Sequence, residues 1–333
     1  MLRPATILAA LLCAPLCAPL AHAADITPAI VFDMGGKFDK SFNESVHDGA
    51  EAFTKSTGTA VREFEPQNDT QREQALRNFA NRGQDPIIAV GFSQATAVKT
   101  VAAEFPKIRF VIIDSVVDAP NVQSILFREE QGSYLAGLIA ALRSATGTIG
   151  FVGGMDVPLI RKFACGYEQG AKHANPQIKV LQNMTGSTPA AWADPVRGAE
   201  LTRSQIERGA DVVFQAAGAT GIGILQAAAD AGKYGIGVDS NQDALHPGHV
   251  LTSMVKRVDV ATTTTLSAAR EGTWKPGTTV LGLEQNGVAL TFDQYNAPAV
   301  TEDMKSKVET TRAEIIAGTL KVHDYTSDNT CPN

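Results

Sequence analysis

Three aspartates stand at the ends of apolar, strand-like segments: Asp33, Asp114 and Asp239. In open α/β sheets, ligands bind outside the carboxyl ends of the strands, so this position favours a binding site. A carboxylate accepts short, charge-assisted hydrogen bonds from neighbouring hydroxyl groups. Any one of these aspartates could instead cap a helix or lie in a surface turn. Their shared position at three strand ends nevertheless favours a polyhydroxylated ligand.

Two phenylalanines add an aromatic component to this candidate site. Phe42 and Phe214 could face each other from opposite halves of the chain and sandwich a flat ring. Phe42 could also pack at the start of a helix, and Phe214 in the core of a strand. Combined with the aspartates, the pair predicts a sugar that carries an aromatic base. Four further candidates follow or end strand-like segments: Asn43, Ser93, Gly218 and Lys256.

The loop after the first strand-like segment reads GGKFDKSFNES. Gly35 and Gly36 suggest a phosphate-binding loop, but no G-K-[ST] follows them, which excludes a Walker A loop. Ser41 and Glu44 have the spacing of a capping box, so we expect Ser41 to cap the helix that follows. The loop would then present an aromatic and an amide side chain at the mouth of a cleft.

Signatures of catalysis are absent from the sequence, which contains neither G-x-S-x-G nor H-E-x-x-H. The run GATGIG follows a strand-like segment, but its glycine spacing does not match a dinucleotide fingerprint. No pair of cysteines or histidines has the spacing of metal ligands. We therefore expect no enzymatic activity, no cofactor and no metal site.

The first 23 residues have the composition of an export signal, with Arg3 before an apolar stretch and Ala21-His22-Ala23 at the cleavage point. Leucine precedes both Cys13 and Cys17, where a lipoprotein signal needs a small residue. We therefore expect a periplasmic protein without a lipid anchor.

The formal charge of the chain is −6, and removing Arg3 with the signal makes it −7. An acidic chain without blocks of Lys and Arg gives no reason to expect nucleic acid as a partner. Two cysteines remain after the signal, Cys165 and Cys331. In an oxidising compartment they could form a disulfide, which we favour over one buried and one free thiol.

Strand-like and helix-like segments alternate along the chain, as in α/β proteins. The strands are apolar throughout, which is expected when helices cover both faces of a parallel sheet. We predict two doubly wound lobes joined by a multi-strand hinge, as in periplasmic binding proteins of type I. The expected boundaries are 24–127 plus about 257–283 for one lobe, and 128–256 plus about 284–333 for the other.

Six ordered motifs resemble the basic membrane protein family, the substrate-binding proteins of ABC importers that are similar to purine nucleoside receptor lipoproteins. They are FDKSFNESVHDGA, FVIIDSVVD, FREEQGSYLAG, GFVGGMDVPLIRKFACGYEQGAK, DVVFQAAGATGIG and GIGVDSNQD, within residues 27–320.

The resemblance implies a nucleoside in the cleft between the lobes. Its base would stack between Phe42 and Phe214, with Asn43 and Asp114 at the base edge and Asp33 nearby. Its ribose would be held by Asp239 and Lys256, helped by the Gly218 backbone. Trp192, in the loop PAAWADP, is a weaker candidate that could equally pack on the surface.

The sequence thus predicts a monomeric periplasmic binding protein that delivers a nucleoside, in particular a purine nucleoside, to a membrane ABC permease. Another small polar ligand, such as a free sugar or a furan-type signal, is the alternative within this class. An exported nucleoside hydrolase would need clustered aspartates around Ca²⁺, whereas the acidic residues here are spread over separate strand ends. A sensing partner of a membrane receptor is not separated from a transport role by the sequence.

Overall fold

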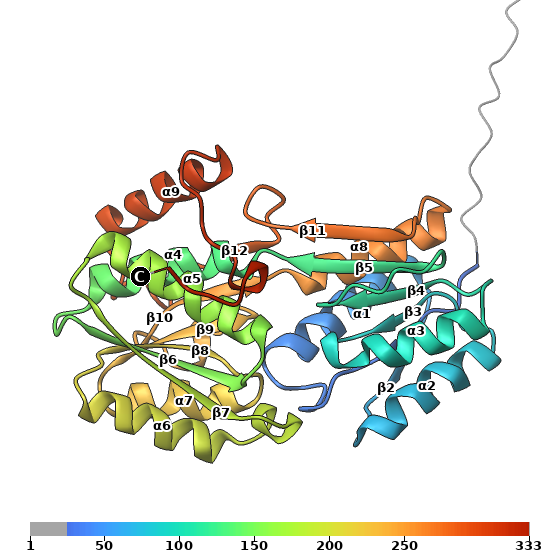
Figure 1. Ribbon diagram of the computed structural model, residues 1–333, viewed down its shortest axis with the longest axis horizontal. Helices are drawn as coiled ribbons and strands as arrows, with labels where there is room; N and C mark the ends of the chain where they lie inside the picture. The colour runs from blue at the N-terminus through green and yellow to red at the C-terminus, as the bar shows by residue number, and fades with distance from the viewer. Residues whose placement is uncertain (1–24, 333) are drawn as a thin grey trace, which may run out of the picture.

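The computed structural model describes residues 25–332, and within them the strands form two six-stranded sheets (Figure 1). The predicted export signal, 1–23, lies outside the described residues. We call the first sheet with its helices lobe I and the second lobe II.

In lobe I the strand order is β11-β5-β4-β3-β1-β2, and every pairing is parallel. The strands are β1 (Ala29–Val31), β2 (Arg62–Phe64), β3 (Ile87–Ala89), β4 (Phe110–Ile113), β5 (Val122–Phe127) and β11 (Gly277–Leu281). Helices α1 (Phe42–Thr57) and α8 (Val258–Glu271) cover one face, and α2 (Asp69–Asn81) and α3 (Ala95–Glu104) cover the other. The central strands β1, β3 and β4 are buried along their whole length, as their unbroken apolar sequence requires.

In lobe II the order is β12-β10-β9-β8-β6-β7, parallel except for β12 against β10. The strands are β6 (Thr148–Met155), β7 (Lys179–Gly186), β8 (Val212–Ala216), β9 (Tyr234–Asp239), β10 (Val250–Lys256) and β12 (Val288–Leu290). Helices α4 (Glu129–Arg143) and α5 (Pro158–Ala174) lie on one face, with α9 (Glu302–Ile316) outside α4. Helices α6 (Pro195–Glu207) and α7 (Thr220–Asp230) lie on the other face (Figure 1).

The described chain passes between the lobes three times: after β5, after β10, and between β11 and β12. Backbone hydrogen bonds join the crossings to one another. The Arg128 N–H donates to the Leu281 carbonyl at 2.9 Å, and the Arg257 N–H donates to the Gly287 carbonyl at 2.8 Å. These three adjacent crossings form the hinge. The predicted fold class, two parallel α/β lobes of the periplasmic-binding-protein type, is confirmed.

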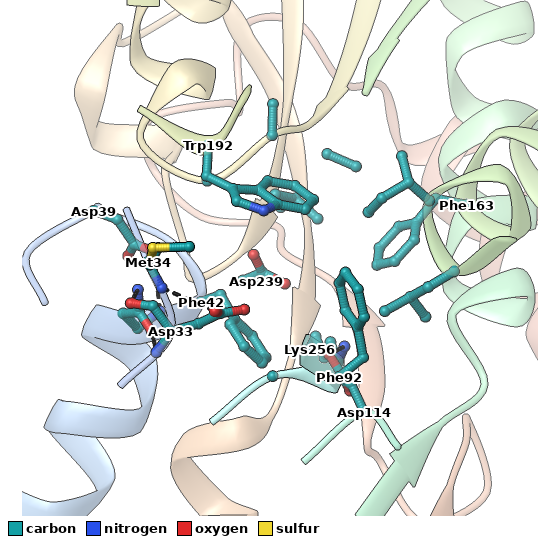
Figure 2. Close-up of a pocket in the computed structure, with 18 residues that line it drawn as sticks. Asp33, Met34, Asp39, Phe42, Phe92, Asp114, Phe163, Trp192, Asp239 and Lys256 are labelled. Atoms are coloured by element: carbon teal, nitrogen blue, oxygen red, sulfur yellow. Dashed lines mark hydrogen bonds and ion pairs between the residues drawn. The ribbon is translucent and has the colours of Figure 1, made fainter. Parts of the chain in front are cut away.

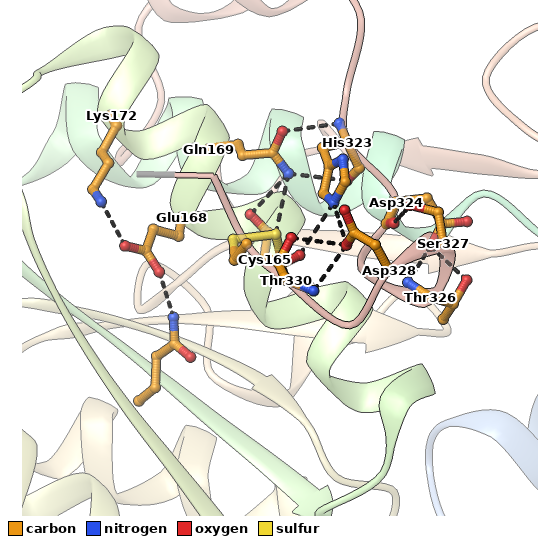
Figure 3. Close-up of a disulfide and its surroundings, with 12 residues drawn as sticks. Cys165, Glu168, Gln169, Lys172, His323, Asp324, Thr326, Ser327, Asp328 and Thr330 are labelled. Carbon is orange, nitrogen blue, oxygen red and sulfur yellow. Dashed lines mark hydrogen bonds and ion pairs between the residues drawn. A yellow bond between two sulfur atoms is a disulfide. The ribbon is translucent and has the colours of Figure 1, made fainter.

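The predicted disulfide between Cys165 and Cys331 is present, with a Cα–Cα distance of 5.6 Å (Figure 3). It fixes the C-terminal tail to α5. The Gln169 side chain, on the same helix, donates to the His323 carbonyl at 3.0 Å and accepts from the His323 N–H at 2.9 Å. The tail is therefore held on lobe II by a covalent bond and by an amide clamp one turn away.

Candidate ligand-binding site

A cavity lies between the lobes, where the carboxyl ends of the parallel strands of both sheets meet (Figure 2). It has about 570 Å³ of free space, including its solvent-open mouth. Its walls are apolar apart from a few charged groups. The lining residues are Asp33, Met34, Asp39, Phe42, Asn43, Gly91, Phe92, Asp114, Leu159, Ile160, Phe163, Trp192, Ala216, Ala217, Gly218, Val238, Asp239 and Lys256.

Asp33 follows β1, and all of its side-chain hydrogen bonds to the protein are made by one carboxylate oxygen. Its Oδ1 accepts from Arg72 at 2.7 Å, from the Ser93 hydroxyl at 2.9 Å and from the Met34 N–H at 2.9 Å. Its Oδ2 has no hydrogen bond to any residue of 25–332. Burial raises the pKa of Asp33, and the Arg72 charge only partly opposes this. One oxygen of a fixed carboxylate is thus available to the cavity.

Asp114 follows β4 and pairs with Lys256, the last residue of β10. The Lys256 ammonium donates to Asp114 Oδ2 at 2.6 Å and lies 2.8 Å from Glu129 Oε1. Burial raises the pKa of Asp114 to about 6, although the lysine lowers it. Burial alone would lower the pKa of Lys256, but these carboxylates outweigh burial and raise it. Asp114 Oδ1 is buried and has no hydrogen-bond partner within the described chain.

Asp239 ends β9 and accepts the Ser41 hydroxyl of lobe I at 2.5 Å through Oδ2. Its other oxygen has no bond to the described residues. Burial raises the pKa of this carboxyl too, against the attraction of Lys256. Asp114 and Asp239 both have positive φ, 68° and 63°, which is uncommon outside glycine. Backbone strain of this kind clusters at functional sites.

The start of α1 differs from the prediction. Ser41 was expected to cap the helix, but its hydroxyl is bonded to the other lobe and makes no cap. Asp39 caps instead, because its carboxylate accepts from the N–H groups of Ser41, Asn43 and Glu44 at 2.8–3.1 Å. Burial raises the pKa of Asp39 to about 7 despite these three bonds. Glu44 accepts from the Lys40 N–H at 2.9 Å, one residue before the position that a capping box requires.

Asn43 lines the cavity, but its amide shapes the loop. Its Oδ1 accepts from the Asp33 N–H at 3.1 Å, and its Nδ2 donates to the carbonyls of Asp33 and Gly36 at 3.2 and 3.1 Å. Gly35 and Gly36 have φ of 125° and 90°, which side chains of L-residues rarely adopt. The loop is therefore held in shape by an amide at its end and two glycines in its middle.

Phe214 does not face the cavity, and its predicted stacking role is wrong. It is completely buried within lobe II, where its ring packs against Phe151 and Tyr167 at centroid distances of 5.6 and 5.3 Å. Strand β8 continues for two residues beyond it, so the strand end that faces the cleft is at Ala216. The error in the prediction was to expect a residue inside the strand, rather than at its end, to face the cleft.

Trp192 supplies the aromatic wall of lobe II instead. Figure 2 shows its indole on one side of the cavity, with the rings of Phe42 and Phe92 on the opposite side. The indole packs directly on the backbone of Gly154, since a Cβ there would lie 2.2 Å from the ring. Gly218, with φ of 58°, also passes close to the Trp192 backbone. Small residues in lobe II therefore make room for the tryptophan.

Eight of the ten predicted residues line the cavity: Asp33, Phe42, Asn43, Asp114, Trp192, Gly218, Asp239 and Lys256. Ser93 lies behind Asp33 and lines an adjoining hollow, and Phe214 lies in the core. Sequence reasoning missed Asp39, Phe92 and Phe163. Phe92 follows β3 immediately before Ser93, so the strand-end rule could have found it. Phe163 lies on α5, and its approach to the cavity depends on helix packing.

Among residues 25–332, no group of three or more His, Cys, Asp or Glu side chains is arranged to hold a metal ion. None of the helices in this range is both long and apolar enough to span a membrane.

Comparison with known proteins decides the family. Residues 26–326 match the Bmp family model, described as an ABC transporter substrate-binding protein, PnrA-like. The chain belongs to this family. The resemblance to basic membrane proteins is thereby confirmed, and the protein is an extracytoplasmic substrate-binding protein of the ABC transporter type.

Relatives of the Bmp-family chain include a CD4+ T-cell-stimulating antigen of Listeria monocytogenes, 32% identical over 321 residues, covering 90% of this chain and 88% of the relative. The ABC transporter nucleoside-binding protein BmpA of Lactococcus lactis subsp. cremoris is 32% identical over 321 residues, covering 90% and 89%. The crystal structure of an ABC transporter solute-binding protein from Aeropyrum pernix K1 has a TM-score of 0.82 at 27% identity, covering 90% of this chain and 93% of that one.

Proposed function

We propose that this Bmp-family protein is an exported monomer that captures a purine nucleoside between its lobes and delivers it to an ABC importer. The observation that carries the proposal is the state of the three strand-end carboxylates. Asp33, Asp114 and Asp239 each commit one oxygen to the protein and leave the other without a partner in the described chain. Such a cavity needs a ligand with several separate O–H or N–H donors.

Ribose hydroxyls would suit the part of the cavity that Asp114, Asp239 and Lys256 line. The family resemblance implies a place at the base edge for Asp114, but Asp114 is bonded to Lys256, so we assign it to the hydroxyls together with Asp239. Lys256 has three N–H donors, of which the protein uses two. The unsatisfied, buried oxygen of Asp114 supports this assignment, because leaving a buried charged acceptor without a donor costs more than about 1–3 kcal/mol.

The base would lie between Trp192 and the phenylalanines Phe42 and Phe92, because flat rings stack well on aromatic faces. Asn43 is engaged in its own loop, so we assign the base edge to Asp33. A carboxylate there accepts from ring or amino N–H groups, as on guanine, hypoxanthine or adenine. The nucleoside-binding name of the BmpA relative agrees with this ligand class.

Closure would bring the two walls together around the ligand. We propose that the lobes move as units with boundaries at 127–128, 256–257 and 283–284, where the crossings lie. Carboxylates from lobe I and lobe II would then meet the ligand only in the closed form, as in other hinge-closing binding proteins.

Calorimetric titration of ligand-stripped protein with guanosine, inosine and adenosine tests the proposal, with cytidine, uridine and free ribose as comparison ligands. We expect binding heat for at least one purine nucleoside and weaker heat for the pyrimidines. No heat with any nucleoside would contradict the proposal, and tighter binding of ribose would indicate a sugar-binding protein.

The variant Asp239→Ala should weaken nucleoside binding by more than about 1.5 kcal/mol, since a charged hydrogen-bond acceptor is lost. Asp156→Ala is the matched control, because Asp156 follows β6 in the same lobe but pairs with Arg161 at 2.7 Å outside the cavity. Equal affinity of the Asp239 variant and the control would remove Asp239 from the site.

A further inference from the structure

Two short segments bridge the lobes beside the cavity without lining it. Residues 40–41 precede α1 in lobe I, and residues 240–242 follow β9 in lobe II. The Gln242 Nε2 donates to the Lys40 carbonyl at 2.8 Å, and the Ser240 hydroxyl donates to the Ser41 carbonyl at 3.0 Å. These two bonds, which we call the bridge, join the lobes directly. None of the residues that make them lines the cavity.

Hydrogen bonds within lobe II fix the orientation of the Gln242 side-chain amide. Its Oε1 accepts from the Val238 N–H at 3.0 Å and from Gln215 Nε2 at 2.8 Å. The orientation of Gln215 is fixed in turn, because its Oε1 accepts from the Ala217 N–H at 3.0 Å. With its oxygen engaged twice inside lobe II, Gln242 can only direct its NH₂ group outward, toward lobe I.

The turn after β9 directs this segment across the boundary. The Ser240 N–H donates to the Val238 carbonyl at 2.8 Å, which makes a three-residue turn around Asp239 with its φ of 63°. Turns of this kind with positive φ are rare and strained. The strain is tolerated where surrounding contacts determine the conformation.

The accepting carbonyls in lobe I are also held by bonds within their own lobe. Lys40 has a φ of 61°, and its N–H donates to Glu44 Oε2 at 2.9 Å. The Asp39 carboxylate fixes the Ser41 N–H at 2.8 Å. The donor and acceptor groups of the bridge are therefore each held by bonds within their own lobe. Joining them costs little conformational entropy.

We infer that Ser240 and Gln242 are positioning residues for ligand capture, which stabilise the closed form through bonds to lobe I that do not depend on the ligand. The apparent affinity of a protein scales with the fraction that occupies its binding-competent form. Losing these bonds therefore weakens capture without removing a ligand contact, and the loss appears mainly as faster dissociation.

Two variants test the contribution of the bridge independently of folding. Ser240→Ala removes one donor from a half-buried position. Gln242→Glu keeps an oxygen that accepts from Gln215 and Val238, but it puts a second oxygen against the Lys40 carbonyl. Asn241→Ala is the matched control, because Asn241 lies in the same segment and bonds to Asp293 and Asp243 on the lobe II side of the hinge. Melting temperatures of all proteins report on folding.

Distances between spin labels on α2 and α6, at Gln74→Cys and Ser204→Cys, measure closure of the ligand-free protein. We expect each bridge variant to lower the ratio of closed to open forms by about three- to tenfold, as loss of one hydrogen bond predicts, with no change for Asn241→Ala. Nucleoside dissociation should accelerate by a similar factor. Equal distance distributions in all proteins, or unchanged dissociation in both bridge variants, would overturn the inference. The label distances do not depend on which ligand the protein takes.

Discussion

Asp114 and Lys256 form an ion pair of 2.6 Å across the boundary between the lobes, although they lie 142 residues apart in the sequence. Both side chains are almost completely buried. The same ammonium lies 2.8 Å from Glu129, at the first crossing of the hinge. One lysine therefore connects a carboxylate of the candidate ligand site to the first crossing between the lobes.

Replacing this lysine should destabilise the protein strongly. Lys256→Met leaves buried carboxylates without their cation, so the free energy of unfolding in urea should fall by about 3–5 kcal/mol. Adding Asp114→Asn should recover part of the loss, because one unpaired buried charge is removed. Additive losses in the double variant would show that the two side chains are not energetically coupled.

Nucleoside binding should weaken as the pH falls from 7 to 5. Burial raises the pKa of Asp114 to about 6, and it also raises the pKa of Asp33 and Asp239. A ligand that donates to these carboxylates favours their ionised forms, so binding below about pH 6 releases protons and becomes weaker, by up to about tenfold per pH unit for each proton released.

Calorimetry in two buffers with different ionisation enthalpies counts the protons released. Asp114→Asn should bind more weakly at pH 7 and show a flatter pH profile than the wild type. Proton uptake on binding, or an affinity that is constant from pH 7 to 5, would contradict the assignment of these carboxylates as acceptors.

Substitutions of Trp192 and Phe214, both in lobe II, should affect different properties. The first should weaken ligand binding and the second should lower stability. Trp192→Leu removes a cavity wall and should weaken nucleoside binding by about 1–3 kcal/mol with a small effect on unfolding. Phe214→Leu lies in the core and should lower the free energy of unfolding by about 1–2 kcal/mol, through lost packing against Phe151 and Tyr167. Titration and urea unfolding of both variants check this. The opposite pattern would restore the stacking role to Phe214.

The disulfide should stabilise the whole fold. Cys165 and Cys331 are 166 residues apart, and a cross-link that closes a long loop restricts the unfolded chain. Reduction, or the double variant Cys165→Ala and Cys331→Ala, should lower the free energy of unfolding by about 2–4 kcal/mol. The double variant should be insensitive to reductant. A wild-type midpoint that reductant leaves unchanged would show that the bridge adds no stability.

The sheets and most of the site were predictable from local pattern. Apolar segments that end in aspartate identify buried parallel strands and their carboxyl ends, and sheet geometry then brings those ends together. Asp33, Asp114 and Asp239 were found in this way. The rule failed for Phe214 because this residue lies inside its strand, two residues before the end, where side chains pack in the core of the lobe.

Other features depend on contacts between distant residues. The Ser41 hydroxyl bonds to Asp239, 198 residues away, and this partner outweighs the local capping pattern. Asp39, two residues earlier, then takes over the cap. Phe163 reaches the cavity only because α5 packs at the edge of lobe II. Local spacing carries no information on any of these contacts.

The position of Trp192 also has a spectroscopic consequence. The sequence contains two tryptophans, and Trp274 follows α8 away from the cavity. A base stacked on the Trp192 indole would quench its emission, while the emission of Trp274 would stay constant as an internal reference. Ligand occupancy can therefore be followed by intrinsic fluorescence in the unlabelled protein.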